Sequence, residues 1–130
     1  MDTSFQKGTR PWHCEKSNPA FLNGVPELLI LELLSRRPMH GYELVQTIRA
    51  ATDGSLEFGE GCVYPILHRL ESDKLLAASK ETVSGRVRLV YRVAPKGKAQ
   101  LADSVSAWRR VVAAIDTALE GGAHGRAAVA

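Results

Sequence analysis

Basic side chains gather in one stretch of this 130-residue chain, and the chemistry they offer is phosphate binding. Residues 74–98 carry seven lysines and arginines against Glu81 alone, a net charge of +6 within a chain of net charge +3. Residues 27–73 are acidic, with eight carboxylates and four bases. A run of like charge often covers only a solvated face, and the phosphate backbone of DNA is the alternative partner. The charge distribution therefore indicates a candidate surface for nucleic acid.

The cysteines and histidines show no metal-ligand spacing. No C-x-x-C or H-x-x-x-H pattern is formed by His13, Cys14, His40, Cys62, His68 and His124. We therefore expect no metal and no cofactor. Two cysteines without a secretion signal are expected as reduced thiols, and a redox-active Cys62 at a helix start is the lesser alternative.

Signatures of catalysis and of membrane insertion are also missing. We find no P-loop, no nucleophile elbow and no carboxylate pair suited to acid–base work, so we expect that the protein is not an enzyme. No basic leader precedes an apolar run, and Glu27 and Glu32 interrupt the one Leu-rich stretch. We therefore expect a cytoplasmic protein that does not enter the membrane.

Hydrophobic periodicity predicts the helices that must position the polar groups. Apolar residues indicate helices over 26–37 and 40–52, with Pro26 in the first turn of the first one. A third helix is expected because Val63, Ile66, Leu67 and Leu70 are spaced i, i+3, i+4, i+7. Proline is tolerated in a first turn, so Pro65 predicts that this helix begins near Gly61 or Cys62.

A hairpin and a last helix follow. Strands are expected over 77–83 and 86–93 around a Ser84–Gly85 turn, and the second strand alternates apolar residues with arginines, which predicts an apolar and a basic face. The last helix should begin at Pro95 and end at Gly121 and Gly122. Spacings of four and three predict the seam of a helix pair at Leu101, Val105, Trp108, Val112, Ile115 and Leu119.

Three helices followed by a hairpin are the element order of a winged helix-turn-helix. We therefore predict a mainly α (α+β) fold, a winged helix-turn-helix with a C-terminal dimerisation helix. The expected divisions are an N-terminal arm (1–24), the DNA-binding domain (25–95), the dimerisation helix (96–120) and a tail (121–130).

The third helix is the expected recognition helix, and its non-apolar positions are the candidate groove face. These positions are Cys62, Pro65, His68, Arg69 and Ser72. Arg69 is the side chain among them able to make a bidentate contact with guanine, and His68 suits either a base or a phosphate. Lys80, Arg86 and Arg88 are expected to contact phosphates. Tyr64 is either a partly buried core residue or a phosphate contact.

Three separated motifs carry a family resemblance. The runs 39–44 (MHGYEL), 63–71 (VYPILHRLE) and 84–93 (SGRVRLVYRV) resemble the PadR family of transcriptional regulators in order and spacing, over about residues 22–119. Members commonly have a serine or threonine where this chain has Cys62, so a thiol is expected at the N-cap of the third helix.

The resemblance implies a short-subfamily PadR protein. Such a protein is a homodimer that binds double-stranded DNA and usually acts as a repressor released by a small ligand. In multidrug-sensing relatives a tryptophan matching Trp108 stacks on flat aromatic ligands between the subunits, so Trp108 is either a dimer-core residue or part of a pocket for a small aromatic effector. A winged-helix module that binds protein and not DNA is the competing function.

Overall fold

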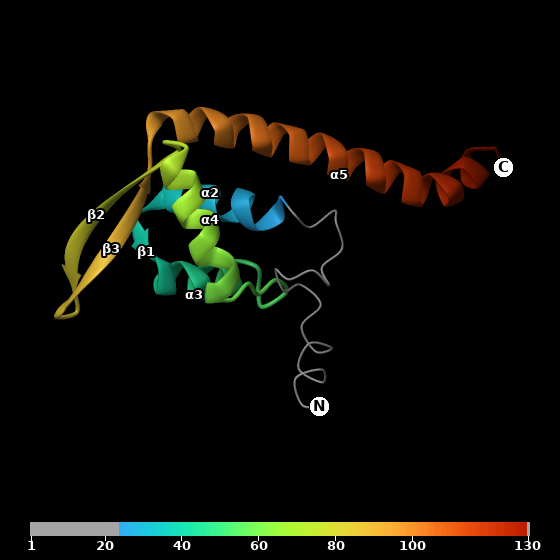
Figure 1. Cartoon of the computed structure of the whole chain (residues 1–130). Helices are drawn as coiled ribbons and strands as arrows, with labels where there is room; N and C mark the ends of the chain where they lie inside the picture. The colour runs from blue at the N-terminus through green and yellow to red at the C-terminus, as the bar shows by residue number, and fades with distance from the viewer. Residues whose placement is uncertain (1–23, 130) are drawn as a thin grey trace.

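The computed structural model describes residues 24–129, and the expected N-terminal arm lies outside these residues except for Gly24. The elements follow in the order α2 (Val25–Arg36), β1 (Met39–His40), α3 (Gly41–Ala51), α4 (Glu60–Ser72), β2 (Leu76–Val83), β3 (Arg86–Val93) and α5 (Pro95–Val129). Figure 1 shows the hairpin at one side of the helices, and the long α5 running past them and beyond. The mainly α winged helix-turn-helix is confirmed.

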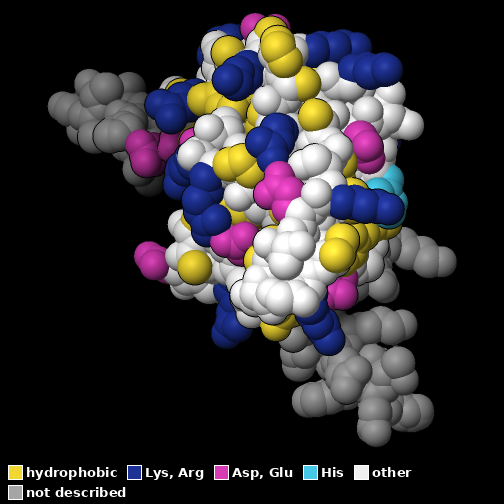
Figure 2. All heavy atoms as spheres, turned by 90° about the vertical axis from the view of Figure 1, so that its left-hand side faces the viewer, with side chains coloured by type: hydrophobic (Ala, Val, Ile, Leu, Met, Phe, Trp, Pro, Cys, Tyr) yellow, Lys and Arg dark blue, Asp and Glu magenta, His cyan; other side chains and the backbone are white. Residues whose placement is uncertain are grey.

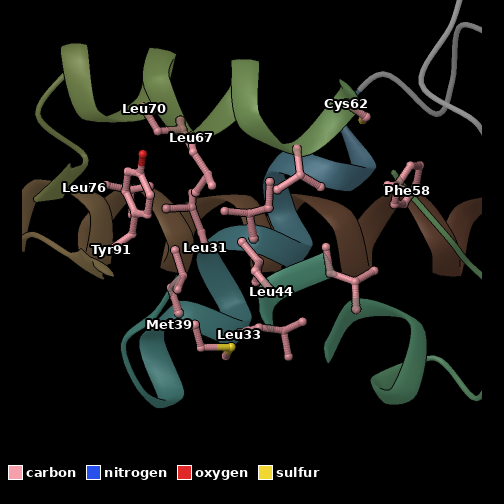
Figure 3. Packing of buried hydrophobic residues seen from close by; sticks show 14 of the residues in the cluster. Leu31, Leu33, Met39, Leu44, Phe58, Cys62, Leu67, Leu70, Leu76 and Tyr91 are labelled. Carbon is pink, nitrogen blue, oxygen red and sulfur yellow. The ribbon is translucent and has the colours of Figure 1, made fainter. Parts of the chain in front are cut away.

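One apolar core joins α2, α3 and α4 to the base of the hairpin. Figure 3 shows Leu67 and Leu70 of α4 near Leu31 of α2 and Tyr91 of β3, and all four are at most 1% exposed. Burying each such side chain stabilises the fold by roughly 1.5–3 kcal/mol, so the predicted stripe of α4 holds the recognition helix in place. Phe58, in the loop before α4, is also fully buried and was not predicted.

The sheet has three strands, in the order β1-β3-β2, and not the two that were expected. The added strand, β1, pairs antiparallel with β3 through Met39 opposite Tyr91 and His40 opposite Val90. Two residues are too few to show the alternation by which a strand is recognised in a sequence. Because β1 directly precedes α3, the pairing ties the start of that helix to the hairpin.

The expected turn closes the hairpin. Ser84 and Gly85 both have positive φ, 53° and 80°, and Val83 pairs with Arg86 across them. Positive φ at both central residues is the geometry of a type I′ turn, whose twist matches that of the flanking strands.

The start of α4 differs from its prediction. The helix begins at Glu60 with Gly59 as N-cap, so Pro65 lies inside the helix and not in its first turn. The reason is that Val63 N–H already bonds to the Gly59 carbonyl at 3.0 Å. Proline at position 65 removes one helical hydrogen bond, the one to the Gly61 carbonyl. Cys62 is therefore not the N-cap.

The end of α5 also differs, because the helix continues past Gly121 and Gly122 to Val129. An interior glycine costs a helix only about 1 kcal/mol relative to alanine, and the alanines that follow favour helix. In the part of the chain that the structure describes, no helix combines the length and the apolar character needed to span a membrane.

Candidate nucleic-acid interface

The solvent-facing side of α4 carries Pro65, His68, Arg69 and Ser72, all of them exposed. The structure thus brings together four of the five positions expected on the groove face. Cys62 is the exception, because it is 5% exposed and belongs to the core cluster. The expectation of reduced thiols is wrong for Cys62, which is disulfide-bonded. Cys14 lies outside the described residues.

Arg69, the expected guanine reader, is held by a carboxylate of another helix. Its Nη2 donates to Oε1 of Glu27 on α2 at 2.8 Å, with the two side chains 52% and 27% exposed. A half-exposed ion pair of this kind contributes about 0–1 kcal/mol, so it restrains the arginine without locking it. The contact with Glu27 was not predicted, since no local pattern links residues 42 positions apart.

Tyr64 lies between α3 and α4 and is half-buried. An added Cβ on Gly41 would come within 2.6 Å of Tyr64 Cζ, so the absence of a side chain at position 41 leaves room for the ring. The ring of His68 is one turn further along α4, with its centroid 6.4 Å from that of Tyr64. The two aromatic side chains therefore line the edge of α4 nearest to the start of α3.

The hairpin does not carry its predicted basic residues on one face. Lys80 is opposite Leu89, whereas Arg88 is opposite Glu81 and Arg86 opposite Val83. Because residues paired across a ladder share a face and neighbours alternate, Lys80 lies on the face away from Arg86 and Arg88. The three basic residues therefore divide between the two faces of the hairpin, and their expected contact with phosphates stays a prediction.

Carboxylates partly neutralise the hairpin. Arg92 Nη2 donates to Glu81 Oε2 at 2.6 Å, and Ser79 Oγ donates to the same oxygen at 2.9 Å. Among the described residues, Arg86, Arg88 and Lys80 have no ion pair. Figure 2 shows this side of the molecule, where lysine and arginine side chains are widely spread with acidic and apolar ones between them.

The apolar face of β3 is buried only at its base. Tyr91 is 1% exposed, but Leu89 is 42% and Val87 70% exposed. The distal hairpin therefore extends beyond the core and presents aliphatic side chains to solvent beside its arginines. Burial of the Tyr91 ring raises the pKa of its hydroxyl above 10.0, with smaller contributions from Glu71 and Tyr64.

The predicted seam of α5 divides into two parts. Leu101 packs on the core of its own chain, so it is not free for a partner. Val105 and Val112 are half-buried, and the large apolar side chains further along are exposed: Trp108 42%, Val111 49%, Ile115 51% and Leu119 76%. Val111 was not predicted as part of the seam. It is the third residue after Trp108, on the next turn of the helix, and it widens the same stripe. The stripe has no partner within the described chain.

Known proteins share this sequence and this arrangement. Residues 30–103 match the model of the transcriptional regulator PadR-like family. A protein of Lysinibacillus sphaericus is 34% identical over 101 residues, covering 77% of this chain and 93% of that protein. The transcriptional regulator Rv3488 of Mycobacterium tuberculosis is 36% identical over 83 residues, covering 64% and 75%. The crystal structure of a PadR-like transcriptional regulator from Bacillus cereus superposes with a TM-score of 0.69 at 29% identity, covering 78% and 98%.

Proposed function

We propose, from the premise that this chain belongs to the PadR-like family, that it regulates transcription by binding double-stranded DNA through α4 and the hairpin. Members of this family are transcriptional regulators and not enzymes. DNA binding would place the protein in the cytoplasm of a bacterium. The proposed base-reading residues are Pro65 and Arg69, and the proposed phosphate contacts are Tyr64, Lys80, Arg86 and Arg88. His68 is proposed to contact either a base or a phosphate.

The observation that carries this proposal is that Arg88, which has no ion pair among the described residues, lines one cleft together with His68 of α4. In a winged helix-turn-helix the recognition helix enters the major groove while flanking groups hold phosphates. Arg86 and Arg88 lie on β3 without ion pairs among the described residues, and His68 and Arg69 are exposed on α4. A protein-binding module would have no need of such a set. The basic hairpin therefore favours DNA over protein as the partner.

The first prediction concerns the salt dependence of binding. Replacing Arg86 and Arg88 with alanine should weaken DNA binding, and should flatten the slope of log affinity against log salt by roughly 0.9 for each lost phosphate contact. Fluorescence anisotropy on a duplex enriched from a random pool by the wild-type protein measures both quantities. Alanine at Arg109, on α5, removes one arginine charge away from the hairpin and is the control for the loss per arginine. Parental affinity and slope in the double variant would contradict the proposed role of the hairpin.

A homodimer is part of the proposal, because one winged helix reads only half a site. The exposed stripe of Trp108, Ile115 and Leu119 supports pairing through α5. Two recognition helices joined in this way would contact half-sites about one DNA turn apart. Repression, with release by a small ligand, is the regulatory mode that we propose.

A small aromatic effector is the ligand class that Trp108 favours, since stacking on an indole contributes about 0.5–1.5 kcal/mol beyond area burial. Titration of planar dyes into a Trp12→Phe variant leaves Trp108 as the single tryptophan. Quenching of its fluorescence, together with release of bound DNA, is the expected result. If no dye quenches the fluorescence or releases DNA, Trp108 is a residue of the dimer core and not part of a ligand pocket.

A further inference from the structure

A small cleft lies where α4, the start of α3 and strand β3 meet. Its volume is about 150 Å³, and the residues that line it include His40, Gly41, Tyr64, His68, Arg88 and Tyr91. Pockets for drug-sized ligands are usually at least about 300 Å³, so this cleft is too small for such an effector. Its size suits a single small group.

The lining of the cleft favours an anion. It contains one arginine, two histidines and two tyrosines, and none of its residues is acidic. Glu43, the nearest carboxylate along the chain from His40, is paired with Arg37 Nη2 at 2.6 Å. Two carboxylates outside the lining also lie near it: Glu71 contributes to the raised pKa of Tyr91, and Glu81, which is bound to Arg92, is opposite Arg88 in the ladder. The cleft itself combines one permanent positive charge with several hydrogen-bond donors.

The start of α3 adds donors to this cleft. His40 is the N-cap of the helix, and its Nδ1 accepts a hydrogen bond from Glu43 N–H at 3.4 Å. With Nδ1 as the acceptor, the proton of the neutral ring is on Nε2, which becomes a donor. The first N–H groups of an 11-residue helix lack partners within the helix, and they carry the positive end of its dipole.

The free edge of β3 contributes backbone groups. The two-residue turn makes Val83 and Arg86 a hydrogen-bonded pair, so the N–H groups of Val87 and Leu89 point away from β2. Strand β1 covers this edge only at Val90 and Tyr91. Val87 and Leu89 also line the cleft, beside Arg88. Amides without a strand partner therefore lie next to the charged side chain.

Tyr91 is the most deeply buried residue of the cleft. Its hydroxyl is buried and has no hydrogen-bond partner among the described residues, which is uncommon because buried polar groups are nearly always paired. Tyr64 has its ring against Gly41 on the other side. The phenol of Tyr64 thus adds to the hydrogen-bonding capacity of the cleft, and the Tyr91 hydroxyl is a buried polar group at its inner wall.

We infer that this cleft seats one backbone phosphate of the bound DNA, with Arg88, His68 and the start of α3 as its ligands. The inference rests on the DNA binding proposed above and deepens it. A strand that passes from the groove occupied by α4 to the groove beside the hairpin crosses between these two elements, where the cleft lies. Arg88 and His68 therefore act on the same phosphate, although they belong to different elements.

Phosphate ethylation interference tests this assignment. Ethylation removes the charge of one phosphate at a time, and the positions that block binding are mapped at low salt on the selected duplex. For the wild-type protein we expect one blocking phosphate in each half-site that stops blocking in both Arg88→Ala and His68→Ala. Arg86→Ala is the same change two residues away on β3 and outside the cleft. Ethylation of this phosphate should still block its binding to DNA.

Several outcomes would overturn the inference. Loss of interference at different phosphates in Arg88→Ala and His68→Ala, or at no phosphate in either, would reject a shared seat while leaving DNA binding intact. Failure of the wild-type protein to select any duplex would reject the proposed function itself. Exchange of chloride for inorganic phosphate at equal ionic strength should not weaken DNA binding selectively. If inorganic phosphate weakens DNA binding by the wild-type protein but not by Arg88→Ala, the free anion and not a DNA phosphate occupies the cleft.

Discussion

At the scale of single residues, Arg69 has a role that depends on a partner in another helix. In the absence of DNA its guanidinium is bound to Glu27 of α2, and its reach toward a base requires that this ion pair opens. The exchange costs little, because a half-exposed pair is worth about 0–1 kcal/mol, whereas a bidentate contact with guanine contributes roughly 1–3 kcal/mol of discrimination. Glu27 is thus expected to moderate the affinity for DNA.

Glu27→Gln should strengthen DNA binding up to about fivefold, which corresponds to about 1 kcal/mol. The neutral amide releases Arg69 and removes a negative charge from the neighbourhood of the phosphates. Anisotropy titrations give the affinity, and Glu32→Gln is the matched control, because Glu32 is on the same helix and is paired with Arg36. In an Arg69→Ala background most of the gain should disappear. An equal gain in that background would show that Glu27 does not act through Arg69.

Tyr91→Phe should raise the free energy of unfolding by about 1 kcal/mol, because it removes a buried hydroxyl that has no partner among the described residues. The raised pKa of Tyr91 means that the folded chain keeps this proton after the unfolded chain has lost it. Its contribution to stability is therefore complete below pH about 10 and falls as the pH rises further. Urea denaturation at neutral pH and above pH 10 checks both points. If Tyr91→Phe lost as much unfolding free energy above pH 10 as the wild type does, Tyr91 would not be the source of that loss.

At the scale of elements, the contact of α3 with α4 sets the shape of the interface. Gly41 is the first residue of α3, directly after the end of β1, and Tyr64 of α4 packs against it. Any side chain at position 41 would push the Tyr64 ring away, and with it the edge of α4 that faces the start of α3. This close approach, and not a turn, is the reason for glycine at this position.

Gly41→Ala should destabilise the fold by about 1–3 kcal/mol, the usual cost of overpacking, although alanine is the better helix former. A double-mutant cycle with Tyr64→Ala separates the two effects. Without the ring, the alanine should become neutral or stabilising, and the free energy of unfolding from urea titrations measures the difference. If the cost of Gly41→Ala were the same in both backgrounds, the clash with Tyr64 would not be its cause.

At the scale of the whole molecule, the proposed DNA-binding groups and the exposed stripe of α5 occupy different regions. The proposed DNA-binding groups are on the hairpin and α4, while α5 extends past the other helices in Figure 1. Apolar side chains as exposed as Leu119, at 76%, are costly to leave in water along a helix. A second copy of the chain, paired along α5, would cover the stripe and bring two recognition helices into one complex.

Ile115→Glu should convert the proposed dimer into a monomer, since it places a charge in the middle of the apolar stripe. Light scattering measures the mass, and loss of tight DNA binding should accompany the change. Thr117→Glu introduces the same charge on the opposite side of α5, and it should leave the mass unchanged. A wild-type protein with the mass of one chain would refute the pairing itself.

The amino-acid sequence alone predicts the helices, the hairpin and their order, because hydrophobic spacing and turn residues act over a few positions. The stripe of Val63, Leu67 and Leu70 and the Ser84–Gly85 turn are signals of this local kind, and both have their predicted form in the structure. The prediction of a winged helix-turn-helix rests on these local signals.

The placement of side chains relative to distant ones required the folded chain. Arg69 and Glu27 are brought together by the packing of two helices, β1 pairs with β3, and Leu101 packs on the core because α5 lies against α2. Each of these contacts joins segments that carry no trace of one another in their local patterns. They arise only when the apolar faces pack, since close packing then selects which polar groups meet.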